Sequence, residues 1–216
     1  YDSVPLRDFK ELNDWETVIF VYQSALKQVE TKIDILNGEF QHRHKYNLIE
    51  HVKSRIKTPE SIVKKLKRHG YESSIENMVR YVNDIAGIRI SCSFTSDIYL
   101  IADMISKQND LTILARRDYM KNPKKSGYRS YHMLVTTPVF LSDSIIDTKV
   151  EIQIRTVAQD FWATLEHKMH YKFEGDGPDY ITKELRECAR YVAELDTRME
   201  ELNNEIQKYG KLSDKK

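Results

Sequence analysis

Two stretches of regular apolar spacing frame the chain. From residue 8 to about residue 43, apolar side chains recur at three- and four-residue steps, which predicts one long amphipathic helix. Over about 181–208 the steps alternate strictly between three and four residues, the heptad pattern of a coiled-coil seam. Such a seam serves equally well to pack the helix on its own domain or to join two subunits. The two stripes are Trp15, Val18, Tyr22, Ala25, Val29, Ile33, Leu36 and Phe40, and Leu185, Cys188, Val192, Leu195, Met199, Leu202 and Ile206.

The region between these helices mixes helix and strand signals. Thr58 suits a helix N-cap, Pro59 the first helical position and Gly70 the stop, and a short helix is expected over about 75–82. Strands are expected over 85–92, 111–114, 128–137 and 149–155, the last with clean apolar–polar alternation. Further helices are expected over 95–107 and from a Thr156/Gln159 capping box to about 171, before a break at 175–178.

This order of elements predicts an α/β (α+β) protein in which helices flank a mixed sheet. With 216 residues the chain is long enough for one sizeable domain with helical appendages. We expect a helical extension over 1–47 that packs on the core or on another subunit, a catalytic domain over 48–174, and a helix within 178–216 for packing or oligomerisation.

Charge is balanced overall but uneven along the chain. The net charge is +1, yet residues 51–70 hold seven Lys or Arg against one acid, and residues 116–129 hold six against one. Clustered cations in a neutral protein indicate a local polyanion site rather than a generally basic surface. The two cysteines, Cys92 and Cys188, lie far apart, and so low a count fits a reducing cytosol better than a disulfide. No apolar run reaches the ~18–20 residues of a membrane span and no signal peptide is visible, so we expect a cytoplasmic protein without a membrane partner.

The first candidate site is the helix that begins after Thr58. Free N–H groups and the helix dipole make such an end favourable for phosphates, and Ser61 and Lys65 share a face there, with Arg55 and Lys57 just upstream. A basic helix with solvated side chains is the commoner explanation of the same pattern.

A second candidate is a pair of carboxylates. Asp84 lies where the chain enters a strand, and Glu151 projects from the polar face of another. Two carboxylates at neighbouring strand ends could share Mg²⁺, which prefers oxygen ligands. Asp84 and Arg89 have opposite parity, so both reach one site only if Asp84 precedes the strand or Gly87 hosts a bulge.

A third candidate is an aromatic platform. Tyr128, Ser130 and His132 share parity, and an exposed aromatic flanked by polar side chains can stack on a base; an ordinary half-exposed tyrosine is the alternative. Asp160, in the first turns of the following helix, could accept hydrogen bonds from guanine N1–H and its exocyclic amine, which adenine does not offer. A solvated acid at a helix start explains Asp160 equally well.

Six ordered blocks of sequence together resemble the synthetase domain of RelA/SpoT-type enzymes. Among these the chain looks most similar to the small alarmone synthetases, and within them to the RelP type. The resemblance spans about residues 50–172. The blocks are Ser54-Arg55-Ile56-Lys57 with Ser61 and Lys65, then DIAGIRI from Asp84, Arg117-Asp118-Tyr119, SGYRSYH from Ser126, VEIQIRT from Val150 and FWATLEH from Phe161.

The resemblance implies a nucleotidyltransferase-like fold and transfer of pyrophosphate from ATP to the 3′-hydroxyl of GDP or GTP, giving AMP and (p)ppGpp. It implies that Asp84 binds Mg²⁺ and that Glu151 completes the metal site, activates the 3′-hydroxyl, or does both. It further implies that Arg55 and Arg89 enclose the adenine ring from its two sides. The ATP phosphates would be held by Lys57, Ser61, Lys65 and Arg117. Tyr128 would stack on guanine, with Lys124, His132 and Gln153 near the acceptor nucleotide.

Some features depart from the family's patterns. Where one subgroup has Arg-x-Lys-Asp, this chain has Ala115-Arg116-Arg117-Asp118, which leaves the choice between GDP and GTP open. No His-Asp pair occurs, so we expect synthesis without hydrolysis. We see no regulatory tail after the last helix and therefore expect no dependence on ribosomes. Relatives commonly form tetramers, and the heptad offers a means of self-association. Alternatives are the same transfer to a tRNA 3′ end or to an adenosine nucleotide, and a non-catalytic RNA-binding module.

Overall fold

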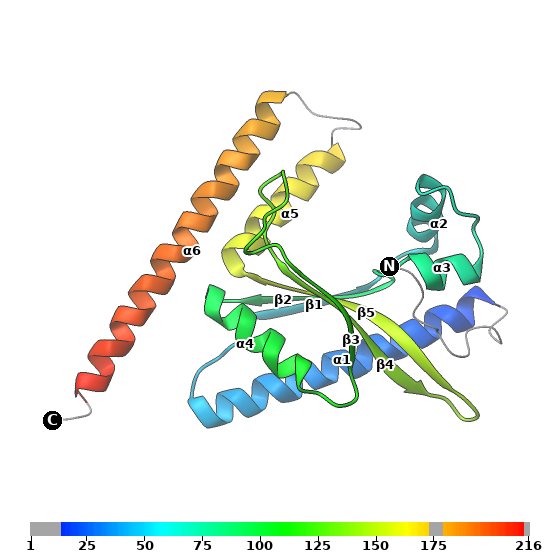
Figure 1. Cartoon of the computed structure of the whole chain (residues 1–216), viewed down its shortest axis with the longest axis horizontal. Coiled ribbons are helices and arrows are strands. Elements are labelled where there is room, and N and C mark those ends of the chain that lie inside the picture. The colour runs from blue at the N-terminus through cyan, green and yellow to red at the C-terminus, as the bar shows by residue number, and fades with distance from the viewer. Residues whose placement is uncertain (1–13, 173–178, 214–216) are drawn as a thin grey trace.

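A five-stranded mixed sheet with helices on both sides forms the body of the protein (Figure 1). The structure, a computed structural model, describes residues 14–172 and 179–213. The predicted helical residues 8–13 and the predicted break at 175–178 lie outside these ranges. The elements are α1 (Trp15–His44), β1 (His51–Ile56), α2 (Pro59–Arg68), α3 (Ile75–Tyr81), β2 (Ala86–Cys92), α4 (Thr95–Ser106), β3 (Thr112–Asp118), β4 (Tyr131–Phe140), β5 (Ile145–Thr156), α5 (Val157–Lys172) and α6 (Asp179–Ser213).

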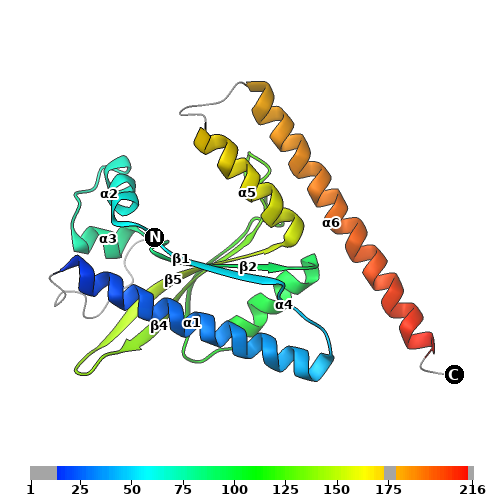
Figure 2. The ribbon, with the colours of Figure 1, turned by 180° about the vertical axis from the view of Figure 1, so that it is seen from behind.

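The strand order is β1-β2-β5-β4-β3, with β2 and β5 parallel and every other pair antiparallel. Alternate residues of the central strands, such as Ile88, Ile152 and Met133, are at most 2% exposed and form the core with α1. Seen from behind, α1 runs diagonally across this face of the sheet, with α4 beside it (Figure 2). The opposite face of the sheet is therefore left uncovered by α1 and α4, and it lies open between α5 and the α2–α3 pair.

The first helix follows its predicted apolar stripe. Asp14 caps it, accepting from the Thr17 N–H at 2.7 Å, and the buried residues Val18, Tyr22 and Ile33 belong to the stripe. The helix ends at His44 because Lys45 takes the left-handed conformation with φ 54°. The first helix is thus an integral part of the core rather than a detached extension.

Local capping chemistry also places α2 and α5 as predicted. Thr58 accepts from the Ser61 N–H at 3.3 Å, Pro59 opens α2, and Gly70 follows its end with φ +77°. At α5, Thr156 accepts from the Gln159 N–H at 3.1 Å. The return bond of a capping box is missing, since Gln159 Oε1, which would accept it, has no hydrogen-bond partner among the described residues, while Nε2 donates to Asp196 at 3.1 Å.

Strand boundaries differ most from the sequence prediction. β1 was not expected, because its residues are largely exposed and follow no apolar alternation. β3 reaches Asp118 and β5 starts at Ile145, so both are longer than predicted. β4 begins at Tyr131, and the expectation that Tyr128 lies on that strand was therefore wrong.

The last helix packs on the body through only one side. Ala189 and Asp196 are buried, whereas the distal part of the predicted seam is exposed. Leu195, Met199, Leu202 and Ile206 are 52%, 49%, 52% and 69% exposed. Within one chain, the heptad pattern is therefore not explained by packing on the domain.

Candidate active site

Two adjacent rows of side chains cross the open face of the sheet. The pairing register places residues of all five strands opposite one another in each row. Directly opposite residues lie about 4.5–5.5 Å apart, so side chains distant in sequence become neighbours. The first row is Lys53, Arg89, Gln153, His132 and Arg117, and the second is Arg55, Gly87, Glu151, Leu134 and Ala115.

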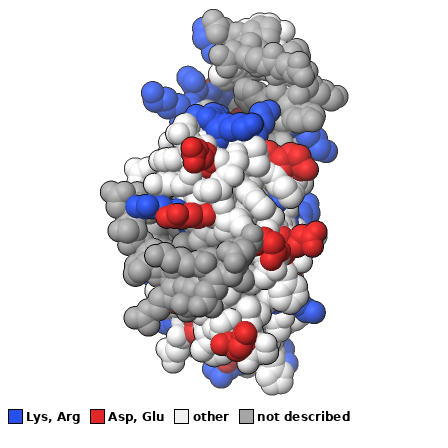
Figure 3. Space-filling view, turned by 90° about the vertical axis from the view of Figure 1, so that its right-hand side faces the viewer, with Lys and Arg blue, Asp and Glu red and all other residues white. Residues whose placement is uncertain are grey.

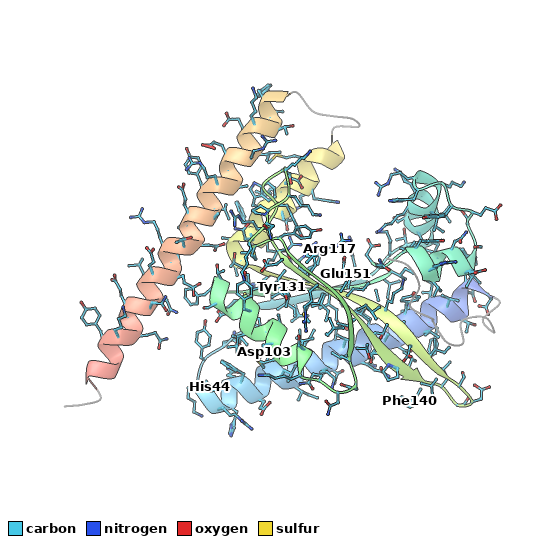
Figure 4. All side chains as sticks on the ribbon, viewed as in Figure 1. His44, Asp103, Arg117, Tyr131, Phe140 and Glu151 are labelled. Atoms are coloured by element: carbon cyan, nitrogen blue, oxygen red, sulfur yellow. The ribbon has the colours of Figure 1, made fainter. Side chains whose placement is uncertain are left out.

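A β-bulge aims Arg117 at this face. The register of β3 on β4 shifts between Ile113 and Ala115, so Ile113 opposes the core residue Val135 while Arg117 opposes His132. In a regular strand Ile113 and Arg117, four residues apart, would share a face, and the bulge places them on opposite faces. Figure 4 shows Arg117 near Glu151, on the part of the sheet between α5 and the α2–α3 pair.

Asp84 lies just before β2, at the edge of the same site. Its two carboxylate oxygens accept separately from Lys57 and Lys65, each at 2.7 Å. Burial alone would raise the pKa of Asp84, but the hydrogen bonds from the two lysines outweigh it and bring the pKa to about 2. The position of Asp84 ahead of the strand resolves the parity conflict with Arg89, and β2 carries no bulge against either neighbour.

Asp84 and Glu151 open onto one cavity of about 200 Å³. Lys65, Arg117 and His132 line the same cavity, as does Asn83. Among the described residues no group of three His, Cys, Asp or Glu side chains forms a ready-made metal cage. Two carboxylates and the Asn83 amide nevertheless give the hard oxygen ligands that suit Mg²⁺, which commonly takes its remaining ligands from water and substrate phosphates.

Tyr128 is fixed by a chain of polar contacts behind Glu151. Its hydroxyl lies 2.9 Å from His132 Nε2 and accepts from Arg155 at 3.2 Å. Arg155 also donates to Gln153 at 2.7 Å, and Gln153 donates to Glu151 at 2.9 Å. The chain links the predicted base platform to the predicted catalytic carboxylate.

The imidazole of His132 is held neutral. Burial, together with the positive charges of Lys124, Arg155 and Arg117, lowers its pKa from 6.5 to about 3. The 3.9 Å separation between His132 Nδ1 and Glu151 is therefore a polar contact at neutral pH, not an ion pair.

This shift predicts an acid-sensitive contribution to folding. Between pH 6.5 and about 3 the unfolded chain binds a proton that native His132 refuses, so native stability falls as pH drops through this window. The slope from one such group is at most about 1.4 kcal/mol per pH unit. Urea unfolding of metal-free protein at pH 7 to 4 should show a flatter dependence for His132→Asn than for wild type. The exposed control His51→Asn should keep the wild-type slope, and parallel curves for His132→Asn would contradict the prediction.

Asp160 lies between two arginines rather than free beside the platform. Its Oδ1 is 3.6 Å from both Arg89 and Arg155 and makes no hydrogen bond with any residue that the structure describes. A buried acceptor without a hydrogen-bond partner is free to accept from a ligand. Asp160 also offsets the positive charges of Arg89 and Arg155, which is a structural role. The expectation that it reads guanine therefore stays a prediction.

Two residues near the site escaped the sequence reasoning. Arg155 is 2% exposed, and its parity with Glu151 and Gln153 was the available signal. Lys149 is 4% exposed, donates to the Arg80 carbonyl and the Asn83 side chain at 3.2 and 2.7 Å, and so anchors the turn before Asp84. Burial lowers the pKa of Lys149 to about 8.

Three predicted residues lie at the margins of the cavity. Ser61 is exposed on α2, where its hydroxyl bonds to Thr58, and Arg55 is exposed on β1. Lys124 lies 4.8 Å from the centre of the Tyr128 ring, in the loop between β3 and β4. These side chains surround the cavity rather than line it.

Comparison with known proteins places the chain in a family. Residues 54–176 match the family model described as the region found in RelA/SpoT proteins. The chain belongs to the RelA/SpoT family, and its solved structural neighbours include small alarmone synthetases.

Individual relatives match along nearly their whole length. The GTP pyrophosphokinase YwaC of Bacillus subtilis is 44% identical over 90% of this chain and 93% of its own. The crystal structure of small alarmone synthetase 1 from Bacillus subtilis bound to pppGpp superposes with a TM-score of 0.83, at 34% identity over 89% of this chain and 98% of that one. The crystal structure of small alarmone synthetase 2 from the same organism superposes with a TM-score of 0.81, at 43% identity over 88% of this chain and 99% of that one.

Two further expectations concerned disulfide bonds and membrane-spanning helices. Cys92 and Cys188 are both free thiols, the first buried and the second exposed. Among the described helices, none combines the length and apolar character needed to cross a bilayer.

Proposed function

We propose that this protein is a (p)ppGpp synthetase that transfers pyrophosphate from ATP to the 3′-hydroxyl of GDP or GTP and releases AMP. The observation that carries the proposal is the single cavity that holds Asp84, Glu151, Lys65, Arg117 and His132. Two relatives that each align with about 90% of this chain are named GTP pyrophosphokinases, and one structural neighbour was solved with pppGpp.

The ATP end of the site lies toward β1 and α2. Arg55 and Arg89 belong to adjacent rows on neighbouring strands, which suits two guanidinium groups that enclose a purine. Lys57, Ser61 and Lys65 would contact the ATP phosphates at the start of α2. Because Lys57 and Lys65 bind Asp84 in the protein alone, nucleotide binding would draw at least one of them toward phosphate.

The acceptor end lies toward α5 and the loop before β4. Tyr128 would stack on guanine, and Lys124, His132, Gln153 and Asp160 would surround the acceptor nucleotide. Arg155 fixes the Tyr128 hydroxyl and Gln153 from beneath, so the platform is preorganised.

Asp84 and Glu151 are the residues that would hold Mg²⁺. When bound, the metal would neutralise charge on the ATP phosphates and so lower the barrier to approach of the acceptor oxygen. An oxygen-rich cavity that also holds Lys65 and Arg117 suits a metal-bound polyphosphate better than a bare cation.

The reaction follows from this placement. The acceptor O3′ bonds to the β-phosphorus of ATP as the bond from that phosphorus to the α–β bridging oxygen breaks, and AMP leaves with the bonding electrons. The proton of the 3′-hydroxyl passes to Glu151, which lies one row from Gln153 and His132. Arg117 offsets the negative charge on the transferred group.

We further propose that the enzyme synthesises (p)ppGpp without hydrolysing it and acts in the cytosol without ribosomes. We also propose that it forms a homo-oligomer, a tetramer by resemblance. The exposed apolar residues of α6 support self-association, since four large side chains repeat along one stripe. On the face shown in Figure 3, basic and acidic side chains are interspersed, unlike the continuous basic stripe expected of an RNA-binding module.

The test is transfer of label from γ-³²P-ATP in the presence of Mg²⁺. With GDP or GTP as acceptor, label should move to a guanine nucleotide while AMP forms in equal amount, and EDTA should stop both. Parallel reactions with tRNA and with adenosine nucleotides separate the alternative acceptors. Absence of AMP from every mixture would overturn the proposal.

A further inference from the structure

The loop that carries Tyr128 is pressed against the last helix. A Cβ built on Gly127 would meet the Cβ of Ala189 at 2.5 Å, a distance that real Cβ atoms essentially never show. Gly127 has φ +92° and closes a tight turn by donating to the Lys124 carbonyl at 2.8 Å. The loop and α6 are therefore in contact at backbone distance, with no flexible side chain between them.

The contact continues into a small second core. Trp162 and Ala189 are 4% and 3% exposed, and Tyr128 and Val192 pack against them. The Trp162 indole donates to the Leu185 carbonyl of α6 at 2.9 Å. Arg155 and His132 thus hold Tyr128 at its hydroxyl, while Tyr128 packs against the α5–α6 joint and the neighbouring Gly127 lies against Ala189.

Other bonds fix α6 along its length. The buried Asp196 accepts from Thr156 at 2.8 Å and from Gln159 at 3.1 Å, and Glu200 accepts from the Ser96 N–H at 3.1 Å. A cavity of about 560 Å³ lies beside this joint, and Gly127, Ala189 and Ala193 are among the residues that line it. Ala189 is 3% exposed and lies against Gly127, whereas Ala193, one turn later, is only half-buried, so Ala189 is the point where α6 contacts the loop most closely.

We infer that α6 is a positioning element of the acceptor site and that Ala189 is its positioning residue, acting through Gly127 on Tyr128. The inference rests on the proposed function, because it assigns Tyr128 to the acceptor nucleotide. A helix outside the catalytic sheet then governs acceptor affinity without touching substrate. The expected signature is a rise in the acceptor KM with little change in the KM for ATP, because the ATP end depends on β1, β2 and α2.

Ala189→Leu adds bulk where α6 contacts Gly127, so it should displace the loop and raise the KM for GDP by roughly tenfold, as expected when most of one base-stacking contact is lost. The KM for ATP should change less than about twofold. Ala193→Leu is the matched control, because the same change one turn later lies on the same cavity but away from Gly127, and it should leave both KM values near wild type. Tyr128→Ala is the reference for a full loss of stacking.

A rescue keeps the inference testable if Ala189→Leu does not fold. Gly127→Ala should raise the GDP KM through both backbone strain and the Cβ clash, and adding Ala189→Gly should remove the clash part. A substantial recovery of GDP KM in the double variant supports the inference. A merely structural role would lower Tm or the active fraction and leave the ratio of the two KM values unchanged.

The outcomes separate the two proposals. If wild type transfers no label, the proposed function fails. If wild type is active but Ala189→Leu keeps the wild-type GDP KM, or the double variant is no better than Gly127→Ala, the inference about α6 is wrong.

Discussion

Glu151→Gln should leave a folded protein that forms almost no AMP. Glutamine keeps the size of the side chain and a polar contact with Gln153, now 2.9 Å from the Glu151 carboxylate, but it neither accepts a proton nor offers a charged metal ligand. Loss of a general base alone costs about 10²–10⁴-fold in kcat, and loss of a metal ligand adds to it. The measurement is single-turnover AMP formation at saturating ATP and GDP, with far-UV circular dichroism as the check on folding.

Asp147→Asn is the matched control for Glu151→Gln. Asp147 lies on the same strand with the same parity, but it is exposed near the β4–β5 hairpin, far from the cavity. Its kcat should stay within about twofold of wild type. Turnover within tenfold of wild type in Glu151→Gln would remove Glu151 from both proposed roles.

Arg117→Ala should lower kcat by roughly 10³-fold or more, since arginines that offset charge in phosphoryl transfer contribute about 10³–10⁵. Arg117 lines the cavity with Glu151 and Asp84, so its charge lies close to where the transferred group must sit. The loss should fall mainly on kcat, because the charge on the bridging oxygen develops in the transition state. Steady-state rates over full ATP and GDP ranges make the measurement.

Arg116→Ala provides the comparison from the next position on the same strand. Arg116 faces the other way and donates to the Ser106 hydroxyl of α4 at 3.0 Å. Its removal should affect stability slightly and kcat hardly at all. Equal losses of kcat in the two variants would contradict the prediction, because they would show that activity depends on the positive charge of β3 in general and not on Arg117 in the cavity.

The sequence predicted best where local chemistry decides the structure. Asp84 ahead of its strand, the Thr58 cap and the stripe from Val18 to Ile33 depend on neighbours in the chain, and all are present as expected. The gathering of Asp84 with Glu151 was reached through the resemblance and the parity of strand positions. Spacing alone could not place two acids that lie 67 residues apart.

Long-range packing set what the sequence could not show. β1 is an edge strand whose exposed side chains lack alternation, so Arg55 had no visible position on the sheet. Arg155 has the charge of a surface residue but is buried because Tyr128, Gln153 and Asp160 surround its guanidinium. Such burial is visible only once β5 and α5 are assembled.

The irregularity at Leu114 has a consequence for how relatives of this protein are aligned. Because the bulge absorbs one residue of β3, deletion of Leu114 would leave a regular ladder in which Arg117 still opposes His132 and Arg116 still faces α4. The facing of each arginine is thus set by its pairing with β4, and not by the number of residues that precede it in β3. Two family members that differ by one residue at this point would present the same arginine on the open face, so the gap in their alignment belongs at the bulge.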